Sequence, residues 1–289
     1  MTLAMVPDPD LNVSDAAHRV AQILRGQSIV VLSGAGISTE SGIPDYRGPE
    51  TGRRARNPIP FNRFIGDPAA RSRYWARASV GWARVAEARP NPAHDALAQL
   101  EAWGHIEGLI TQNVDRLHHR AGSHRVVELH GTLDEVRCLG CEARESRTEL
   151  QKRLLRLNPG WTAQTVAAAP DGDAELESGA EARFRTVGCL RCGGALKPDV
   201  VFFGEPVPRP RVERSYAWVD RADALLVVGS SLTVFSGFRF VKRAHKQGKP
   251  IVILNVGPTR GDALATLKIE GRVGAVLPAI AEQLAGHSP

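Results

Sequence analysis

The four cysteines of this chain form two pairs, Cys138/Cys141 and Cys189/Cys192, with two residues between the members of each pair. Two such pairs can place four thiolates around one tetrahedral zinc ion. Four thiolates fill the coordination shell, so we expect one structural zinc ion (Zn2+) and not a catalytic one. A zinc ribbon that binds nucleic acid is also disfavoured, because the loop between the pairs carries the acidic residues Asp171, Asp173, Glu175, Glu177 and Glu181 and would repel phosphate.

Small and polar residues follow four short apolar runs, which cover residues 28–32, 106–110, 224–228 and 251–254. These runs are typical of buried parallel strands. In open parallel sheets the ligand lies outside the carboxyl ends of the strands, so the four clusters are expected to meet at one site. In chain order, the clusters consist of Gly34, Ala35 and Gly36; Thr111, Gln112, Asn113, Val114 and Asp115; Gly229, Ser230 and Ser231; and Asn255, Val256 and Gly257.

The first cluster resembles part of a dinucleotide-binding glycine loop. Gly34 and Gly36 would let the backbone approach a pyrophosphate, with a following helix N-terminus favouring the negative charge. The usual third glycine is replaced by Thr39, and the next glycine is Gly42. No second strand carries the acidic residue expected about 20 positions further on. A dehydrogenase is therefore disfavoured, and a purely structural strand-to-helix turn stays open as an alternative.

The predicted fold class is α/β, with a Rossmann-like parallel sheet domain and a smaller inserted domain that is helical plus a zinc ribbon. We expect helices over 15–24, capped by Ser14, over 68–85, and over 91–103, capped by Asn91. The segment 159–183 is expected to be a mobile loop or a weak helix. The expected boundaries are 1–49, 91–135 and 198–289 for the sheet domain, with a helical insertion at 50–90 and a zinc-binding module at 136–197 forming the small domain.

Composition and charge limit the remaining possibilities. The 289 residues are 43% hydrophobic, which supports a packed core, and the net charge of +6 suits a phosphate-bearing ligand. The arginine clusters at 53, 54 and 56 and at 71, 73 and 77 are not interleaved with aromatic residues in the way a nucleic-acid groove requires, so no direct nucleic-acid contact is expected. We find no secretory signal and no apolar run near the ~20 residues that span a bilayer. A cytoplasmic protein without membrane contact is expected, and there paired cysteines favour metal over disulfide.

Seven motifs together resemble the sirtuin family, in the family's order and over about residues 28–275. They are the glycine-rich run 34–47, the segment 111–115, His130-Gly131, the two cysteine pairs, the segment 197–205, the turn 229–232, and Asn255. The context of Tyr46 is similar to the class II branch, which includes a mitochondrial lipoamidase and ADP-ribosyltransferase type as well as bacterial relatives.

The resemblance implies an NAD-dependent protein lysine deacylase, which cleaves nicotinamide from NAD and transfers the acyl group of acyl-lysine to ADP-ribose. An NAD-dependent mono-ADP-ribosyltransferase or a lipoamidase-type deacylase is the alternative. The resemblance makes His130 the general base, a role that suits a side chain whose pKa lies near working pH. It places Asn113 and Asp115 around nicotinamide, with Ala35 and Ile43, and it counts both polar residues as catalytic.

The resemblance also implies the remaining contacts. Tyr46 would shield the reactive carbon from water, and Asp45 and Arg47 would order the cofactor loop. Residues 200–205 are expected to form a strand that leads into a glycine turn. The acyl-lysine peptide or protein would bind as an added strand between this edge and the one that follows the turn 229–231. The implied peptide contacts are Val201, Phe202, Phe203, Gly204, Glu205, Leu232 and Val234. The implied cofactor contacts are Gly34, Ala35, Gly36, Ser38, Thr39, Ile43, Asp45, Tyr46, Arg47, Gln112, Asn113, Asp115, Gly229, Ser230, Ser231, Asn255, Val256, Gly257 and Val273.

Each of these residues also has a plainer interpretation. Asn113 and Asp115 could cap the short helix expected over 116–121. The turn 229–231 and Asn255 could be ordinary turn residues, and Val201 and Phe202 could be core. A zinc-dependent interaction module without catalysis is a further alternative. The other histidines are expected to be capping or surface groups, among them His94, His118, His119 and His124.

Overall fold

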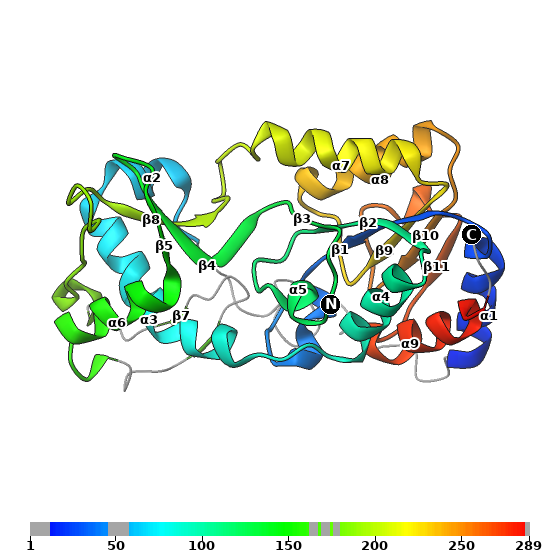
Figure 1. The fold of residues 1–289 in the computed structure, drawn as a ribbon, viewed down its shortest axis with the longest axis horizontal. Coiled ribbons are helices and arrows are strands. Elements are labelled where there is room, and N and C mark those ends of the chain that lie inside the picture. Colours follow the sequence, from blue (N-terminus) through cyan, green and yellow to red (C-terminus); the bar gives the residue numbers. More distant parts are fainter. Residues whose placement is uncertain (1–11, 46–57, 162–166, 169–173, 176–179, 287–289) are drawn as a thin grey trace, which may run out of the picture.

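The computed structural model describes residues 12–45, 58–161, 167–168, 174–175 and 180–286. Its elements form two groups along the long axis of the molecule (Figure 1). One group surrounds a six-stranded sheet, and the other surrounds a three-stranded sheet. The predicted α/β class is confirmed.

The six-stranded sheet has the order β11-β10-β9-β1-β2-β3, and every neighbouring pair is parallel. The four predicted strands are confirmed, and two strands of three residues each, β3 and β11, were not predicted. A three-residue run is too short to show a pattern of its own. The bounds are Ile29–Ser33 (β1), Ile106–Thr111 (β2), Val126–Glu128 (β3), Ala224–Val228 (β9), Ile251–Leu254 (β10) and Leu267–Ile269 (β11).

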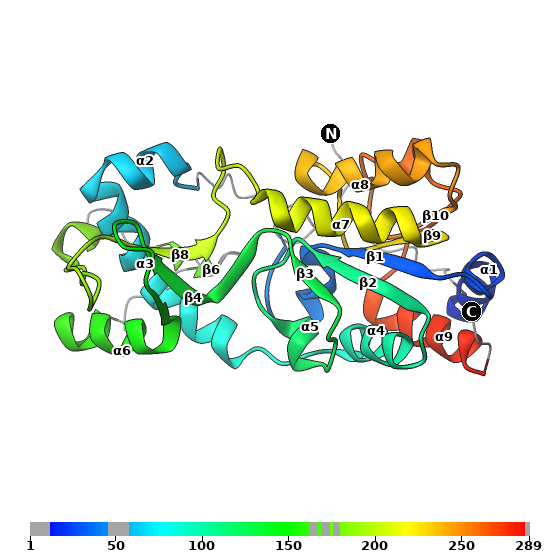
Figure 2. The same ribbon diagram turned by 45° about the horizontal axis from the view of Figure 1, so that its top comes forward.

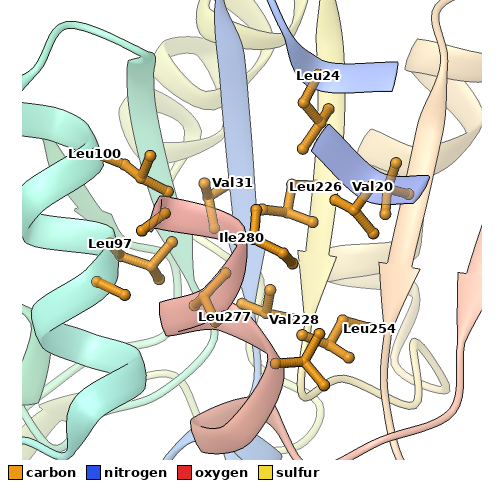
Figure 3. Packing of buried hydrophobic residues seen from close by; sticks show 14 of the residues in the cluster. Val20, Leu24, Val31, Leu97, Leu100, Leu226, Val228, Leu254, Leu277 and Ile280 are labelled. Atoms are coloured by element: carbon orange, nitrogen blue, oxygen red, sulfur yellow. The ribbon is translucent and has the colours of Figure 1, made fainter. Parts of the chain in front are cut away.

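Helices cover both faces of this sheet (Figures 1 and 2). One face packs against α1 (Val13–Leu24), α4 (Pro92–Ala102) and α9 (Val273–Leu284), and the other against α7 (Arg209–Arg221) and α8 (Phe235–Lys246). Figure 3 shows the first interface, where leucine and isoleucine side chains of α4 and α9 meet valines and leucines of β1, β9 and β10. Burial of both faces explains the unbroken apolar runs in these strands.

Helix ends follow the sequence closely, with one correction. Asn91 caps α4 and its side chain accepts from the Ala93 amide at 3.0 Å. The helix near the N-terminus begins at Val13, and its cap is Asn12, whose side chain accepts from the Asp15 amide. The predicted cap Ser14 therefore lies inside the first turn. Asparagine and serine are about equally good caps, so residue type alone could not choose between them.

The three-stranded sheet is antiparallel, with the order β5-β4-β8. It packs with three helices around an aromatic core that includes Phe64, Tyr74, Trp75, Trp161 and Phe202. The strands are β4 (Gly131–Cys138), β5 (Arg144–Ser146) and β8 (Leu196–Val200), and the helices are α2 (Phe61–Gly66), α3 (Pro68–Glu87) and α6 (Arg147–Leu157). Both β4 and β8 cross the domain boundaries expected at 135/136 and 197/198.

The short elements bring two further corrections. The glycine loop continues into two 3-10 turns, η1 (Ala35–Ile37) and η2 (Thr39–Ser41), where an α-helix was expected. Gly42 ends η2 with φ 81°, a left-handed conformation that stops the helix. Within 159–183, the described residues include a paired β6 (Ala167–Ala168) and β7 (Ala174–Glu175), followed by η4 (Ala180–Arg183). The remaining short elements are α5 (Leu117–Arg120) and η5 (Asp262–Leu264).

Candidate active site at the carboxyl edge of the sheet

The glycine turn after β1 packs directly against the turn after β9. The Gly36 amide donates to the Gly229 carbonyl at 2.8 Å. A Cβ atom at Gly36 would lie 2.9 Å from the Gly229 Cα, and one at Gly34 would lie 2.7 Å from the Ser230 Cβ. Both glycines are therefore required by backbone-to-backbone packing between two strand ends, in addition to any role in binding a phosphate.

The turn after β2 is fastened to this glycine segment through Ser38. The Ser38 hydroxyl donates to the Asp115 carboxylate at 2.7 Å, and the Asn113 side-chain amide donates to Ser38 Oγ at 3.0 Å and to the Gly34 carbonyl at 3.1 Å. Asp115 is buried, and burial raises the pKa of its carboxyl group. Asp115 also accepts from the Leu117 amide at 2.9 Å, so the alternative role at the start of α5 is present as well.

His130 lies between β3 and β4 and is held at both ring nitrogens. Its Nδ1 is 2.9 Å from the Gln112 carbonyl oxygen, and its Nε2 is 2.8 Å from the Ser236 hydroxyl at the start of α8. Burial of the ring, followed by the positive charges of Arg211 and Arg239, lowers the pKa of His130, although the Gln112 carbonyl acts in the opposite direction. The ring is thus kept neutral near pH 7, as a general base requires.

Gln112 connects His130 with the turn after β9. Its side-chain amide donates to Ser230 Oγ at 2.8 Å. The Gly229 amide in turn donates to the Leu254 carbonyl at the end of β10. The strand ends of β1, β2, β9 and β10 are therefore joined by hydrogen bonds, and the predicted meeting of their clusters at one edge is observed.

The turn after β10 is organised locally. The side-chain amide of Asn255 donates to the carbonyls of Val256 and Gly257 at 2.8 and 3.1 Å, as an ordinary turn residue would. Val273 begins α9 and is buried. One contact here was missed by sequence reasoning: Glu40 of η2 accepts from the Gly274 amide at 3.2 Å, which anchors the glycine segment to α9.

The expected peptide edge after β8 is joined to His130 through the backbone. The Val201 amide donates to the His130 carbonyl at 2.8 Å. Phe202 packs 4.8 Å from Phe64 in the aromatic core, which is the alternative role named above. The strand expected over 200–205 ends at Val200, because the Glu205 carboxylate turns back to accept from the Phe202 amide at 2.9 Å. Phe203 is 47% exposed.

The other residues that the sequence predicts to contact the peptide differ in their exposure to solvent. Leu232 is buried, and Val234, the residue before α8, is partly buried. Gly204 has φ +82°, which confirms the expected glycine turn. Glu205 is partly buried and forms an ion pair with the buried Lys197 at 3.0 Å. The Glu205 side chain therefore stabilises the loop 201–205 that follows β8.

Near the glycine segment, Ile43 is buried and packs in a small cluster with Ala88 and Leu117. Asp45 is partly buried. The predicted contacts Tyr46 and Arg47 lie outside the described residues.

Two of the remaining histidines correct the sequence interpretation. His94 and His118 are buried, with ring centroids 4.9 Å apart, and His118 Nε2 is 2.8 Å from Ser33 Oγ. His94 also completes the capping box of α4, so its expected capping role is confirmed while a surface position is not. His119 is partly buried and His124 is exposed. Burial lowers the pKa of His94 to about 4.

The four cysteines come together as expected. Their Sγ atoms all lie within 4.8 Å of one another, with 3.4 Å between Cys138 and Cys192 and 3.7 Å between Cys141 and Cys189. Zn–S bonds of about 2.3 Å in a tetrahedron require S–S separations of roughly 3.8 Å. Backbone amides of Gly140, Arg191 and Gly194 donate to these sulfurs, which favours thiolates. The donor set fits one structural zinc ion with no open position.

These observations define an α/β protein whose parallel sheet presents a linked set of amide, carboxylate, hydroxyl and imidazole groups at its carboxyl edge. Comparison with known proteins identifies the family within this class. The Sir2 family model matches residues 34–236. The chain belongs to the Sir2 family.

Curated relatives and solved structures agree with this placement. The chain is 58% identical over 246 residues to an NAD-dependent protein deacetylase of Xanthomonas campestris pv. campestris (strain 8004), covering 85% of this chain and 84% of that protein. It is 49% identical over 289 residues to NAD-dependent protein deacetylase 1 of Mycobacterium avium (strain 104), covering 98% of each. A structure described as Sir2 with a p53 peptide and NAD+ gives a TM-score of 0.74 at 33% identity, covering 92% of this chain and 97% of that one.

Among the described residues, no helix is both long enough and apolar enough to cross a membrane.

Proposed function

We propose that this chain is an NAD-dependent protein lysine deacylase, which releases nicotinamide from NAD and transfers the acyl group of acyl-lysine to ADP-ribose. The observation that carries the proposal is a neutral, doubly held His130 beside the linked strand ends of the Sir2 fold. Curated relatives at up to 58% identity are NAD-dependent protein deacetylases. A similar structure binds a propionylated peptide, at 31% identity and a TM-score of 0.73, so acyl-lysine peptides are the proposed substrates.

In this proposal Asn113 and Asp115 bind nicotinamide, with Ala35 and Ile43 completing the pocket. Support comes from the fixed geometry of the two polar side chains, because Ser38 holds both of them before any ligand arrives. Preorganised polar groups stabilise developing charge without reorganisation. The raised pKa of Asp115 means that its carboxyl group can also donate a hydrogen bond when protonated.

His130 acts as the general base and accepts a proton from a ribose hydroxyl at Nε2. The Gln112 carbonyl supports this assignment, because it can only accept a hydrogen bond and therefore fixes the proton of the neutral ring on Nδ1. The nitrogen that remains unprotonated is Nε2, and a ribose hydroxyl would replace the Ser236 hydroxyl as its hydrogen-bond partner. A single positioned base contributes roughly 10²–10⁴-fold to the rate.

The proposed dinucleotide contacts are the residues named from the sequence at the ends of β1, β2, β9 and β10, together with the start of α9. The proposed peptide contacts are the backbone of 201–205 and of 232–234, which would pair with an extended substrate. Backbone pairing suits the observation that Phe202 and Leu232 direct their side chains into the core. Sequence demands on the peptide would then be small.

The zinc ion is proposed to be held by the four cysteines in a purely structural role. We also propose the division into a sheet domain (1–49, 91–135 and 198–289) and a small domain (50–90 and 136–197). The separate cores around the two sheets support it. A cytoplasmic location is proposed because the cysteines serve a metal, as is usual in a reducing compartment.

The test is an assay of purified, zinc-loaded protein with NAD and a panel of acyl-lysine peptides from acetyl to long-chain, dicarboxyl and lipoyl. We expect one nicotinamide released for each acyl group lost. His130→Ala should abolish acyl transfer while NAD still binds, and the exposed His124→Ala should leave both unchanged. Label from NAD that stays on protein would instead indicate the mono-ADP-ribosyltransferase, and preference for lipoyl peptides the lipoamidase type. A fully active His130→Ala protein would contradict the mechanism.

A further inference from the structure

Two arginines border the chain segment 231–234, which is one of the two proposed peptide edges and leads directly into α8. The Arg260 amide donates to the Ser231 carbonyl at 2.9 Å, and its guanidinium donates to the Thr233 carbonyl at 3.4 Å. Arg239 lies in the second turn of α8, and its positive charge lowers the pKa of His130. Both cations therefore lie beside the proposed substrate.

Each of these guanidinium groups lies over an aromatic ring of α8. The central carbon of Arg239 is 5.3 Å from the centroid of the Phe235 ring, and that of Arg260 is 4.6 Å from the centroid of the Phe238 ring. Phe235 is the first residue after the edge and is 52% exposed. A cation–π contact uses the positive charge but none of the five N–H donors of a guanidinium. Most of these donors are therefore available to an anion.

Neither arginine has a carboxylate partner in the part of the chain that the structure describes. The side chain of Arg239 forms no hydrogen bond there, and its Nε atom is buried without an acceptor. Arg260 is exposed, and its guanidinium contacts a backbone carbonyl and an aromatic ring. A partly buried guanidinium with unused donors is a favourable site for an incoming carboxylate, which can accept two of its N–H groups at once.

Carboxylates that border the two proposed peptide edges are already paired. Asp262 lies in η5, which packs against α8, and it forms an ion pair with Lys268 at 2.8 Å. At the other edge, Glu205 is paired with Lys197 at 3.0 Å and with Arg137 at 3.4 Å. One carboxylate faces two cations there, so that edge is not acidic either. The two edges together therefore present uncompensated positive charge to the substrate.

We propose that Arg239 and Arg260 form an anion subsite beside the edge 231–234, which binds an acidic side chain of the substrate near the acyl-lysine. This inference rests on the function proposed above and names its substrate class: acyl-lysines in acidic sequences. Backbone pairing alone discriminates little among sequences, and the arginines add a preference for charge. Because Arg260 is exposed, its charge acts at the surface of a bound peptide and not on a buried acyl group.

The test is a set of acetyl-lysine peptides that differ at one flanking position at a time, where glutamate, glutamine or lysine is placed. Binding is measured by fluorescence anisotropy without NAD, and kcat and KM are measured with NAD. Glutamate should bind more tightly than glutamine at one or more positions, by roughly two- to fivefold for each arginine contacted, and lysine more weakly. The preference should weaken with added salt. It should appear in KM and not in kcat, because the contact is equal in ground and transition states.

Variants assign the preference to the two side chains. Arg239→Gln and Arg260→Gln should each lower the ratio of glutamate to glutamine affinity, the double variant should abolish the preference, and Arg239→Lys should retain most of it. A change in His130 caused by Arg239→Gln affects both peptides alike and cancels in this ratio. The control is Lys246→Gln, which removes an exposed positive charge about 10 Å further along α8 and should leave the ratio unchanged.

Three results would overturn the proposal. The first is equal affinity of the wild type for glutamate and glutamine peptides at every position, or a ratio that the double variant leaves unchanged. The second is a preference for dicarboxyl-acyl groups in neutral peptides that the double variant loses, since the anion would then belong to the acyl group. The third is an equal loss for all peptides together with weaker NAD binding, which would assign the arginines to the dinucleotide phosphates.

Failure of the proposed function is distinguishable from failure of this inference. A wild-type protein that removes no acyl group with NAD would contradict the proposed function, and the anisotropy series would still measure the charge preference. A wild-type protein that is active but indifferent to the charge of the peptide would contradict only the subsite.

Discussion

The two groups of elements are stabilised in different ways. The sheet region, comprising β1–β3, β9–β11 and their helices, has two large cores made almost entirely of aliphatic residues. The cysteine region, comprising β4, β5, β8, α2, α3 and α6, has a smaller core rich in aromatic rings, with four thiols at one end. It also buries whole charges: Arg147 lies 4.9 Å from the Trp82 ring, and Lys197 is paired with Glu205.

This difference shows where each region's stability is concentrated. In the sheet region, many aliphatic residues each contribute part of the free energy of unfolding. In the cysteine region, most of it comes from a metal site and a few charged or aromatic residues. His130 lies at the junction, directly before β4, and its carbonyl accepts from Val201, directly after β8. The proposed base is therefore positioned by both regions, and a distortion of either region should displace it.

The largest effect is expected from loss of the metal site. In Cys189→Ser one thiolate is removed, and structural zinc sites add ~10–16 kcal/mol of apparent binding free energy to folding. We expect zinc content to fall well below one ion per chain and the cysteine region to unfold, which fluorescence of Trp75 and Trp161 would report. Leu190→Ser is the control, because Leu190 adjoins Cys189 and is 77% exposed. Full zinc content and native fluorescence in Cys189→Ser would show that the cysteine region does not depend on the metal site for its stability.

Truncation of one buried side chain in the sheet region should lower the free energy of unfolding by a smaller amount. Leu277 of α9 is fully buried between the helix layer and the sheet (Figure 3). Leu277→Ala should lower the free energy of unfolding by about 2–5 kcal/mol, through lost burial and a residual cavity. Denaturant titration measures this, with the exposed Ile65→Ala as the matched control. Loss of zinc or of the whole fold in Leu277→Ala would show that stability is not shared among many residues as described.

A smaller, pH-dependent effect is expected from the buried histidines of the sheet region. Burial lowers the pKa of His94 from 6.5 to about 4, so between these values the unfolded chain binds more protons than the folded one. The associated stability is complete above pH 6.5 and is lost as pH falls toward 4, by about 3 kcal/mol. Glu128 acts in the opposite direction, because burial raises its pKa to about 7.

The contribution of His94 is therefore measured as a difference. Unfolding free energies of the wild type and of His94→Gln, compared between pH 7 and pH 5, should show a shallower decline in the variant. His124→Gln removes an exposed histidine and should follow the wild type. Parallel curves for all three proteins would mean that His94 is not held neutral by burial.

Much of this arrangement was predictable from local pattern. The four longer strands were recognised because β-branched runs end in glycine or polar clusters, and the zinc ligands because two cysteine pairs share one spacing. The buried state of His94 was missed, although it falls three residues before Leu97 on the apolar face of α4. A polar residue on an apolar helix face is the signal that was overlooked.

The remaining details depended on contacts between distant segments. Gly34 and Gly36 were interpreted as space for a phosphate, but the structure shows that they also admit the turn after β9. Only the parallel pairing of β1 with β9 brings Gly36 beside Gly229. Likewise, the Gln112 carbonyl and the Ser236 hydroxyl meet His130 from elements 18 and 106 residues away in sequence. No local pattern contains that information.

The central claim is that the linked strand ends form one NAD site. It is tested most directly by calorimetric titration of NAD into folded, zinc-loaded protein, with and without an acyl-lysine peptide. We expect saturable heat with one site per chain, which Asn113→Ala weakens and the exposed His124→Ala does not. An absence of heat in the wild type under both conditions, with zinc content and fold intact, would contradict the account.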